Sequence, residues 1–492
     1  MILHLPILQV IVPLMAAPLC LFLKQPKLVW LFAVIATGLT FLISVLLLQQ
    51  VTTNGTLIYE LGGWPAPWGI EYRIDELNAY LLVIISSISA VVLMAAHTSL
   101  QKELSKDRHT YFYMLYLLTL TGMLGIVSTG DAFNVFVFLE VSSLSAYALI
   151  AMGKDRRALW ASYQYLIMGT IGATFILIGI GLMYQMTGTL NMSDLALRLP
   201  EVSQTRTVFV SFAFIVVGIC LKLALFPLHL WLPNAYAYAP SIVTALIAAT
   251  ATKVAVYLLI RFTFSVYGLT FSFTTLPLNI LFMVLGLLGV FVASVAAIYQ
   301  TNVKHIFAYS SVAQIGYMIV GLSMGTAMGL TATLVHVFNH ALMKSALFLA
   351  LAAVVYRIGS VQLSQFQGLG RQMPFTMAAI VVGGLSLIGV PLTVGFISKW
   401  YLIIAVLENG WWPVAVLILL GSLLAIVYIW RIIEAAYFKP PVEGSENVKE
   451  APLSILIPVW ILIFANVYFG IDTRLSVDLA QSAAESLFGM AP

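Results

Sequence analysis

Charged side chains are scarce in this sequence, which has 9% charged and 61% hydrophobic residues among its 492 positions. Soluble globular proteins carry about a quarter charged residues. So few charges cannot cover a water-exposed surface, and they leave no basic patch for a nucleic acid. The composition therefore excludes a soluble enzyme or a nucleic-acid-binding protein, and it predicts an all-α, polytopic protein of the lipid bilayer.

Cysteine is nearly absent as well. The two cysteines, Cys20 and Cys220, both lie inside apolar runs, so they predict no disulfide framework and no Cys-x-x-Cys pair for a metal or iron–sulfur cluster. The first residues, MILHLP, have no Lys or Arg before the apolar stretch and no small-residue cleavage site after it. We therefore expect a retained first span, and neither a metal nor a cofactor.

Long apolar runs are what the sequence does contain. A helix needs about 20 predominantly apolar residues to cross the hydrocarbon core of a membrane. Fourteen runs meet that need: 3–23, 28–50, 75–97, 111–129, 132–152, 158–186, 207–229, 241–262, 278–300, 306–327, 329–356, 374–407, 412–434 and 452–471. We number these predicted spans 1 to 14.

Lysine and arginine indicate the orientation of the spans. Fourteen of the 23 basic residues follow odd-numbered spans, among them Lys102, Lys154 and Lys439, whereas the opposite side carries five. Because cytoplasmic loops are enriched in Lys and Arg, both termini are expected outside the cytoplasm. That arrangement requires an even number of spans, which favours fourteen.

Helix-breaking residues accompany two of the spans. Pro227 and Pro233 occur at the end of span 7, and Gly389 and Pro391 interrupt span 12, which is too long for one straight crossing. Since the two breaks lie five spans apart, we predict two inverted five-helix repeats, spans 4–8 and 9–13, an architecture typical of transporters. The predicted units are 1–110, 111–262, 278–434 and 452–492.

Ionisable residues also lie inside the apolar spans. They are Glu140, Lys222, Lys253, His336, His340, Lys344 and Lys399. Each charge in hydrocarbon costs several kcal/mol unless it meets a partner or water. Buried ion pairs that only lock helices together are one interpretation, but four lysines cannot all be neutralised by one carboxylate. The set is better explained as a proton relay.

Lysine suits such a relay because an ammonium group removed from water gives up its proton more readily. A carboxylate about 4 Å away restores the charged form. Moving Glu140 towards or away from Lys222 would therefore decide whether Lys222 keeps its proton. Pro227 also leaves the carbonyl of Leu223 without its usual N–H partner, which can loosen and hydrate the helix beside Lys222.

His336, His340 and Lys344 recur every four residues in span 11, so they share one helix face along which a proton can pass. An i, i+4 histidine pair also occurs in zinc proteases, but there a Glu must follow the first His, and Val337 stands here. Glu434, near Arg431 and Lys439 at the end of span 13, is either a local surface pair or a cytoplasmic proton mouth.

Several segments resemble the antiporter-like membrane subunits shared by respiratory complex I and the Mrp-type multisubunit sodium/proton antiporters. They are FLEVSSLSAYALI, LKLALFPLHLWLPNAYAYAPSIVTAL, KHIFAYSSVAQIGYM, HVFNHALMKSALFL and GVPLTVGFISKWYL. The segment LGGWPAPWGI, and FISKWYL within the last of these, are most similar to the D subunit of the Mrp type. The resemblance spreads over nearly the whole chain.

The resemblance implies a membrane proton path through Glu140, Lys222, Lys253, His336 and Lys399. Gln314 departs from relatives that have His in span 10, so the connection there would fall to water or to another residue. The implied partners are H⁺, Na⁺ and Mrp subunits of the A, B, C, E, F and G types.

Four functional hypotheses follow from these observations. The favoured one is a proton-carrying antiporter subunit coupled to sodium export. The second is a proton-pumping subunit of a complex I-type NADH dehydrogenase or a membrane-bound hydrogenase, in which neighbouring subunits supply the redox chemistry. A purely structural scaffold does not explain the unpaired lysines, and an intramembrane hydrolase lacks a nucleophile arrangement and the zinc-site glutamate.

Overall fold

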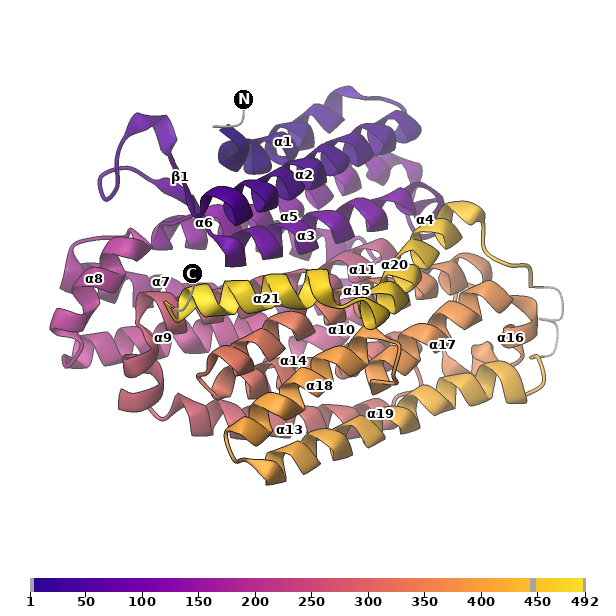
Figure 1. Ribbon diagram of the computed structural model, residues 1–492. Helices are drawn as coiled ribbons and strands as arrows, with labels where there is room; N and C mark the ends of the chain where they lie inside the picture. Colours follow the sequence, from indigo (N-terminus) through magenta and orange to yellow (C-terminus); the bar gives the residue numbers. More distant parts are fainter. Residues whose placement is uncertain (1–3, 443–447, 490–492) are drawn as a thin grey trace.

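The computed structural model describes residues 4–442 and 448–489, and most of its long helices run side by side, parallel or antiparallel (Figure 1). The first helices are α1 (Leu5–Leu19), α2 (Pro26–Asn54), α3 (Glu76–Met94), α4 (Ala96–Glu103), α5 (His109–Ser128), α6 (Ala132–Ala151) and α7 (Arg157–Thr187). They are followed by α8 (Met192–Val202), α9 (Arg206–Leu223), α10 (Trp231–Tyr238), α11 (Ser241–Ala249), α12 (Ala251–Ile260), α13 (Leu278–Ile298), α14 (Val303–Ser323) and α15 (Ala327–Ile358). The last are α16 (Leu369–Gln372), α17 (Pro374–Ile388), α18 (Val394–Glu408), α19 (Trp412–Phe438), α20 (Leu453–Ile471) and α21 (Arg474–Leu487).

Membrane crossing follows from the length and composition of these helices. Within the described residues, 13 helical stretches are long and apolar enough to span a bilayer. The predicted span 374–407 is not among them, because it consists of α17 and α18, which have 15 residues each. The chain is thus a multi-pass membrane protein, and the total of fourteen crossings remains a prediction that counts α17 and α18 as one.

Both predicted helix breaks are confirmed. Helix α9 ends at Leu223, six residues before the predicted end, and Ala224 takes a left-handed conformation with φ 60°. Pro227 explains the early end, since it has no N–H for the Leu223 carbonyl and disfavours a helical residue before it. Helix α17 ends where Gly389 has φ 92°, a conformation that favours glycine.

A third break was not predicted from the sequence. It divides the predicted span 8 into α11 and α12 at Thr250, whose φ is −123°. The Thr250 hydroxyl donates to the Leu246 carbonyl at 2.7 Å. No proline or glycine occurs at this site, so the sequence offers no breaker signal.

A small β-hairpin departs from the all-α prediction. Strands β1 (Leu57–Glu60) and β2 (Glu71–Ile74) pair in antiparallel register in the connection between α2 and α3 (Figure 1). Its tip carries Trp68, which is 90% exposed. Asp75 then begins α3 as an N-cap, in a capping box with Asn78.

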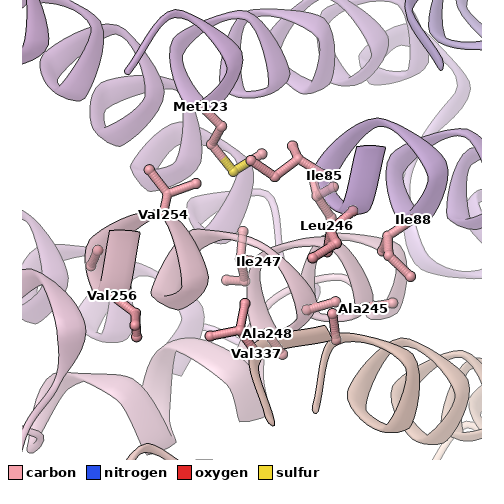
Figure 2. Packing of buried hydrophobic residues seen from close by; sticks show 14 of the residues in the cluster. Ile85, Ile88, Met123, Ala245, Leu246, Ile247, Ala248, Val254, Val256 and Val337 are labelled. Atoms are coloured by element: carbon pink, nitrogen blue, oxygen red, sulfur yellow. The ribbon is translucent and has the colours of Figure 1, made fainter. Parts of the chain in front are cut away.

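The core is centred on α11, in which every residue is buried. Figure 2 shows its side chains, including Leu246 and Ile247, between α3 residues such as Ile85 and the α15 residue Val337. Helices α2 and α19 instead expose apolar side chains such as Leu39 and Leu423. Lys253 on α12 and His336, His340 and Lys344 on α15 are buried as well.

Candidate functional site

Lys222 occupies the last turn of α9, directly before the break, and is 8% exposed. Its ammonium nitrogen contacts two hydroxyls of α6, Ser143 Oγ at 2.9 Å and Tyr147 Oη at 3.4 Å. The indole of Trp231, on α10 beyond the break, donates to the Leu221 carbonyl at 3.0 Å. The same carbonyl accepts from the Ala224 amide at 3.3 Å, so main-chain and indole donors occupy it, and the lysine amine bonds to α6.

Glu140 lies one helical turn before Ser143 on α6, and it does not form an ion pair with Lys222 in this structure. Among the described residues, the ion pairs within 4.0 Å are Arg157–Asp155, Arg198–Asp194, Arg261–Asp75, Lys439–Glu434 and Arg474–Asp472. The Glu140 side chain as a whole is half-buried. Its Oε1 atom is buried, and it has no hydrogen-bond partner among the described residues. The charged groups of Glu140 and Lys222 thus lie more than 4.0 Å apart in this structure, and the switch between them remains a prediction.

Lys253 is fully buried at the start of α12, beside the unpredicted break. Its Nζ donates to the Ala248 carbonyl at 2.6 Å, in the last turn of α11. The last four carbonyls of a helix lack helical N–H partners and carry partial negative charge, so a cation is stabilised there.

Lys399 repeats this arrangement in α18. Its Nζ donates to the carbonyls of Leu387 and Ile388, at 2.9 and 2.7 Å, at the end of α17. The Nζ atom also lies 5.1 Å from the ring centroid of Tyr317. In Lys253 and Lys399, main-chain oxygens of an interrupted helix take the place of a carboxylate.

The predicted histidine face of α15 is present and buried. His336 Nδ1 lies 2.8 Å from Ser398 Oγ, next to Lys399, and the His336 and His340 rings stack with centroids 6.0 Å apart. Within the described residues, neither ring nitrogen of His340 has a hydrogen-bond partner. Such orphaned buried groups in a polar chain are typical of sites that bind internal water.

Lys344 and Glu434 end the predicted set. Lys344 Nζ bonds to Ser310 Oγ at 2.5 Å and to the Phe307 carbonyl at 2.8 Å, both on α14. Glu434 pairs with Lys439 at 3.5 Å, and both side chains are more than two-fifths exposed. This contact fits the local surface pair, and the role of Glu434 as a cytoplasmic proton mouth remains a prediction.

A fifth buried lysine was not predicted. The apolar pattern places Lys304 in a cytoplasmic loop, but it is 4% exposed and donates to the Ala239 carbonyl, at the end of α10, at 3.1 Å. Glu103 binds the amide of Ser241, the first residue of α11, at 2.9 Å. These two charges thus bind main-chain groups of the two residues that flank Pro240 in the sequence. The proline, which marks the boundary between two helices, was the signal that the sequence offered.

A second polar site lies beyond Lys253 on the same helix. Tyr257 and Arg261 follow Lys253 at four-residue intervals, and Arg261 pairs with Asp75 at 2.8 Å and with Asn78 Oδ1 at 2.9 Å. These residues line a cavity of about 440 Å³ that opens beside the hairpin. The four-residue spacing predicts that Lys253, Tyr257 and Arg261 share one helix face. Nothing in the sequence indicated that Asp75 is the partner of Arg261.

A cavity of about 40 Å³ joins Lys222 to α12. Ser143, Tyr165 and Lys222 line it on one side, and Val254 and Ala255, next to Lys253, line it on the other. Its lining is mostly apolar, but a cavity of this size has room for a water molecule, and Ser143 and Lys222 supply polar groups to bind one. Chemically, the described residues offer buried amines that can bind and release protons, with hydroxyls and imidazoles beside them.

Comparison with known proteins gives these residues a family context. The family model described as "NADH:quinone oxidoreductase/Mrp antiporter, TM" matches residues 129–425, more than half of the chain. The N subunit of the NADH-quinone oxidoreductase of Desulforudis audaxviator is 41% identical over 95% of this chain and 96% of its own. The D subunit of the Na⁺/H⁺ antiporter of Alkalihalophilus pseudofirmus is 31% identical over 95% of this chain and 94% of its own.

A solved structure has the same fold. It is a chain of the membrane-bound sulfane sulfur reductase, an archaeal respiratory membrane complex, with a TM-score of 0.89 and 33% identity over 99% of this chain and 97% of that chain. The family model covers more than half of the chain, and the sequence identity and the shared fold extend over nearly its full length. The chain therefore belongs to the NADH:quinone oxidoreductase/Mrp antiporter transmembrane family.

Proposed function

We propose that this chain is the proton-translocating subunit of a multisubunit cation/proton antiporter, coupling proton movement to Na⁺ export. The proposed proton path runs through Glu140, Lys222, Lys253, His336 and Lys399, with His340 and Lys344 as secondary members. The observation that carries the proposal is the set of buried lysines bound to hydroxyls and main-chain carbonyls instead of carboxylates. A buried ammonium without a counter-ion is costly to keep only for structure.

The likeness to the D subunit of a Na⁺/H⁺ antiporter supports the coupled cation and the multisubunit setting. The partners would be Mrp subunits of the A, B, C, E, F and G types. We place both termini outside the cytoplasm. In support, His4 bonds to Tyr59 of the hairpin at 3.0 Å, and Phe488 contacts Phe264 beside the polar cavity near Asp75. The first and last helices of the described chain therefore have their outer ends on the hairpin side. Residues 111–262 and 278–434 would form the two inverted repeats.

Alanine substitutions at Glu140 and Lys222 test this function. In everted membrane vesicles containing the whole complex, each should reduce Na⁺-dependent proton exchange at least about tenfold. Lys439→Ala, at an exposed pair, is the matched control and should exchange normally. Full exchange in the Glu140 and Lys222 variants, with the complex assembled, would overturn the proposal.

A redox-driven proton pump is the second candidate, because the relative at 41% identity is a NADH-quinone oxidoreductase subunit. The same proton path would serve it, with electron transfer in neighbouring subunits. Mass spectrometry of the intact complex separates the two. Partners that carry flavin or iron–sulfur clusters would favour the pump, whereas their absence from an assembled, Na⁺-dependent complex would favour the antiporter.

A further inference from the structure

Two hydroxyls on α6 hold the amine of Lys222, and they lie on the same helix face as Glu140. Ser143 and Tyr147 follow Glu140 by three and seven residues, spacings that keep side chains on one face. Both hydroxyl-bearing residues are 5% exposed. The titratable groups near the amine are Glu140 and Tyr147 from α6 and Tyr165 from α7. Glu140 is the carboxylate in this set, so it competes with the two hydroxyls for the Lys222 amine.

A glycine on α7 leaves the space for this arrangement. A Cβ atom at Gly169 would overlap the Tyr147 hydroxyl, with Tyr147 Cζ at 2.9 Å and Lys222 Nζ at 3.4 Å. Any larger residue would therefore displace the hydroxyl from the lysine. Tyr165 packs against Tyr147 with ring centroids 4.6 Å apart, and it stacks on Trp231 at 3.9 Å. These ring contacts hold the Tyr147 side chain in place.

We propose that Ser143, Tyr147 and Gly169 form a cradle that positions the Lys222 amine away from Glu140. The two hydroxyls compete with the Glu140 carboxylate for the same amine, and the glycine keeps the competing position open. The cradle then sets how much of the time Lys222 faces the cavity that leads to α12. This assignment rests on the proposed function of Lys222 and names positioning residues for it.

Zero-length cross-linking measures the competition directly. A hydrophobic carbodiimide activates a carboxyl group, and an amine beside it then displaces the urea to form an amide, with net loss of one water. In the purified complex, the yield of the Glu140–Lys222 cross-linked peptide reports how often amine and carboxyl meet. In the Ser143→Ala/Tyr147→Phe variant, which loses both hydroxyls, we expect the yield to rise about tenfold.

Matched variants control for altered packing. Ser145→Ala removes a hydroxyl that donates to its own helix at Val141, 2.5 Å away, and it should cross-link like the wild type. Gly169→Ala should raise the yield, whereas Gly181→Ala, on the same helix with nothing within 4 Å of a new Cβ, should not. Ser143→Thr, which keeps a hydroxyl at this position and leaves Tyr147 intact, should give the low cross-linking yield of the wild type.

An unchanged or lower yield in both the double variant and Gly169→Ala would overturn the cradle. Its failure is distinguishable from that of the proposed function, because cross-linking needs no ion gradient. If alanine at Glu140 and Lys222 left exchange intact while the yield still rose, the cradle would stand and the transport role would fall. If alanine at Glu140 and Lys222 abolished exchange but the cross-linking yield did not change in the cradle variants, the transport role would stand and the cradle would fall.

Discussion

At the scale of single residues, the identity of the buried groups was predictable, but their partners were not. Glu140, Lys222, Lys253 and Lys399 stand out in the sequence because charge in an apolar run is expensive. Their acceptors are ordinary residues: a serine, a tyrosine, and the carbonyls of Ala248, Leu387 and Ile388. A serine in a membrane helix, or a main-chain oxygen, carries no mark in a single sequence.

Lys399→Gln separates the structural from the proton-carrying role of this residue. A glutamine amide can still donate to the carbonyls at the end of α17, so we expect a loss of about 1–3 kcal/mol in stability and retained assembly. Without a titratable amine, Na⁺-dependent exchange should fall at least about tenfold. Thermal unfolding of the complex and vesicle exchange measure the two effects.

The comparison variant for Lys399→Gln is Lys439→Gln. Lys439 belongs to an exposed pair, and such pairs contribute about 0–1 kcal/mol. Normal exchange by an assembled Lys399→Gln complex would mean that this amine does not carry protons.

At the scale of helices, breaks were predictable where proline or glycine signals them and nowhere else. The ends of α9 and α17 follow from Pro227 and Gly389, whereas the break at Thr250 depends on tertiary packing of a fully buried helix. The hairpin was missed for a related reason, since each strand has only four residues. Short elements give too few positions for a periodic pattern to emerge.

Gly395 tests how closely the two halves of the interrupted span 12 must approach. Its amide donates to Ser386 Oγ at 3.2 Å, and a Cβ atom at Gly395 would overlap the Ser386 carbonyl. Gly395→Ala should push α18 from α17, lower stability by about 1–3 kcal/mol and impair exchange, because α18 carries Lys399.

Gly38→Ala on α2 provides the contrast, since nothing lies within 4 Å of a Cβ there. It should be neutral or stabilise the helix by up to about 1 kcal/mol. Equal thermal stability of the two alanine variants would show that the α17–α18 contact tolerates a side chain.

At the scale of the whole molecule, the number and place of the apolar runs predicted the membrane class and nearly every long helix. Hydropathy is a local property, so it survives in a single sequence. Which helices pack together is not local: the contact between Lys304 and Ala239, for example, joins residues 65 positions apart. The two-repeat organisation likewise remains a prediction from parity and break spacing.

Cysteine labelling checks the proposed orientation. Trp68→Cys lies at the exposed hairpin tip, and Lys106→Cys lies in the exposed connection after α4. A membrane-impermeant maleimide should label the first in intact cells and the second only after permeabilisation. The native Cys20 and Cys220 are buried, so background should be low. Labelling of Lys106→Cys in intact cells would reverse the orientation.

The carbonyl acceptors of Lys253 and Lys399 also determine what mutagenesis can reveal. A main-chain oxygen survives every side-chain replacement, so an alanine scan would identify both lysine donors but none of their three carbonyl acceptors. Finding them would require amide-to-ester exchange in the backbone at the ends of α11 and α17. In each contact, the acceptor thus depends on the conformation of the backbone and not on the identity of a side chain that a codon change can replace.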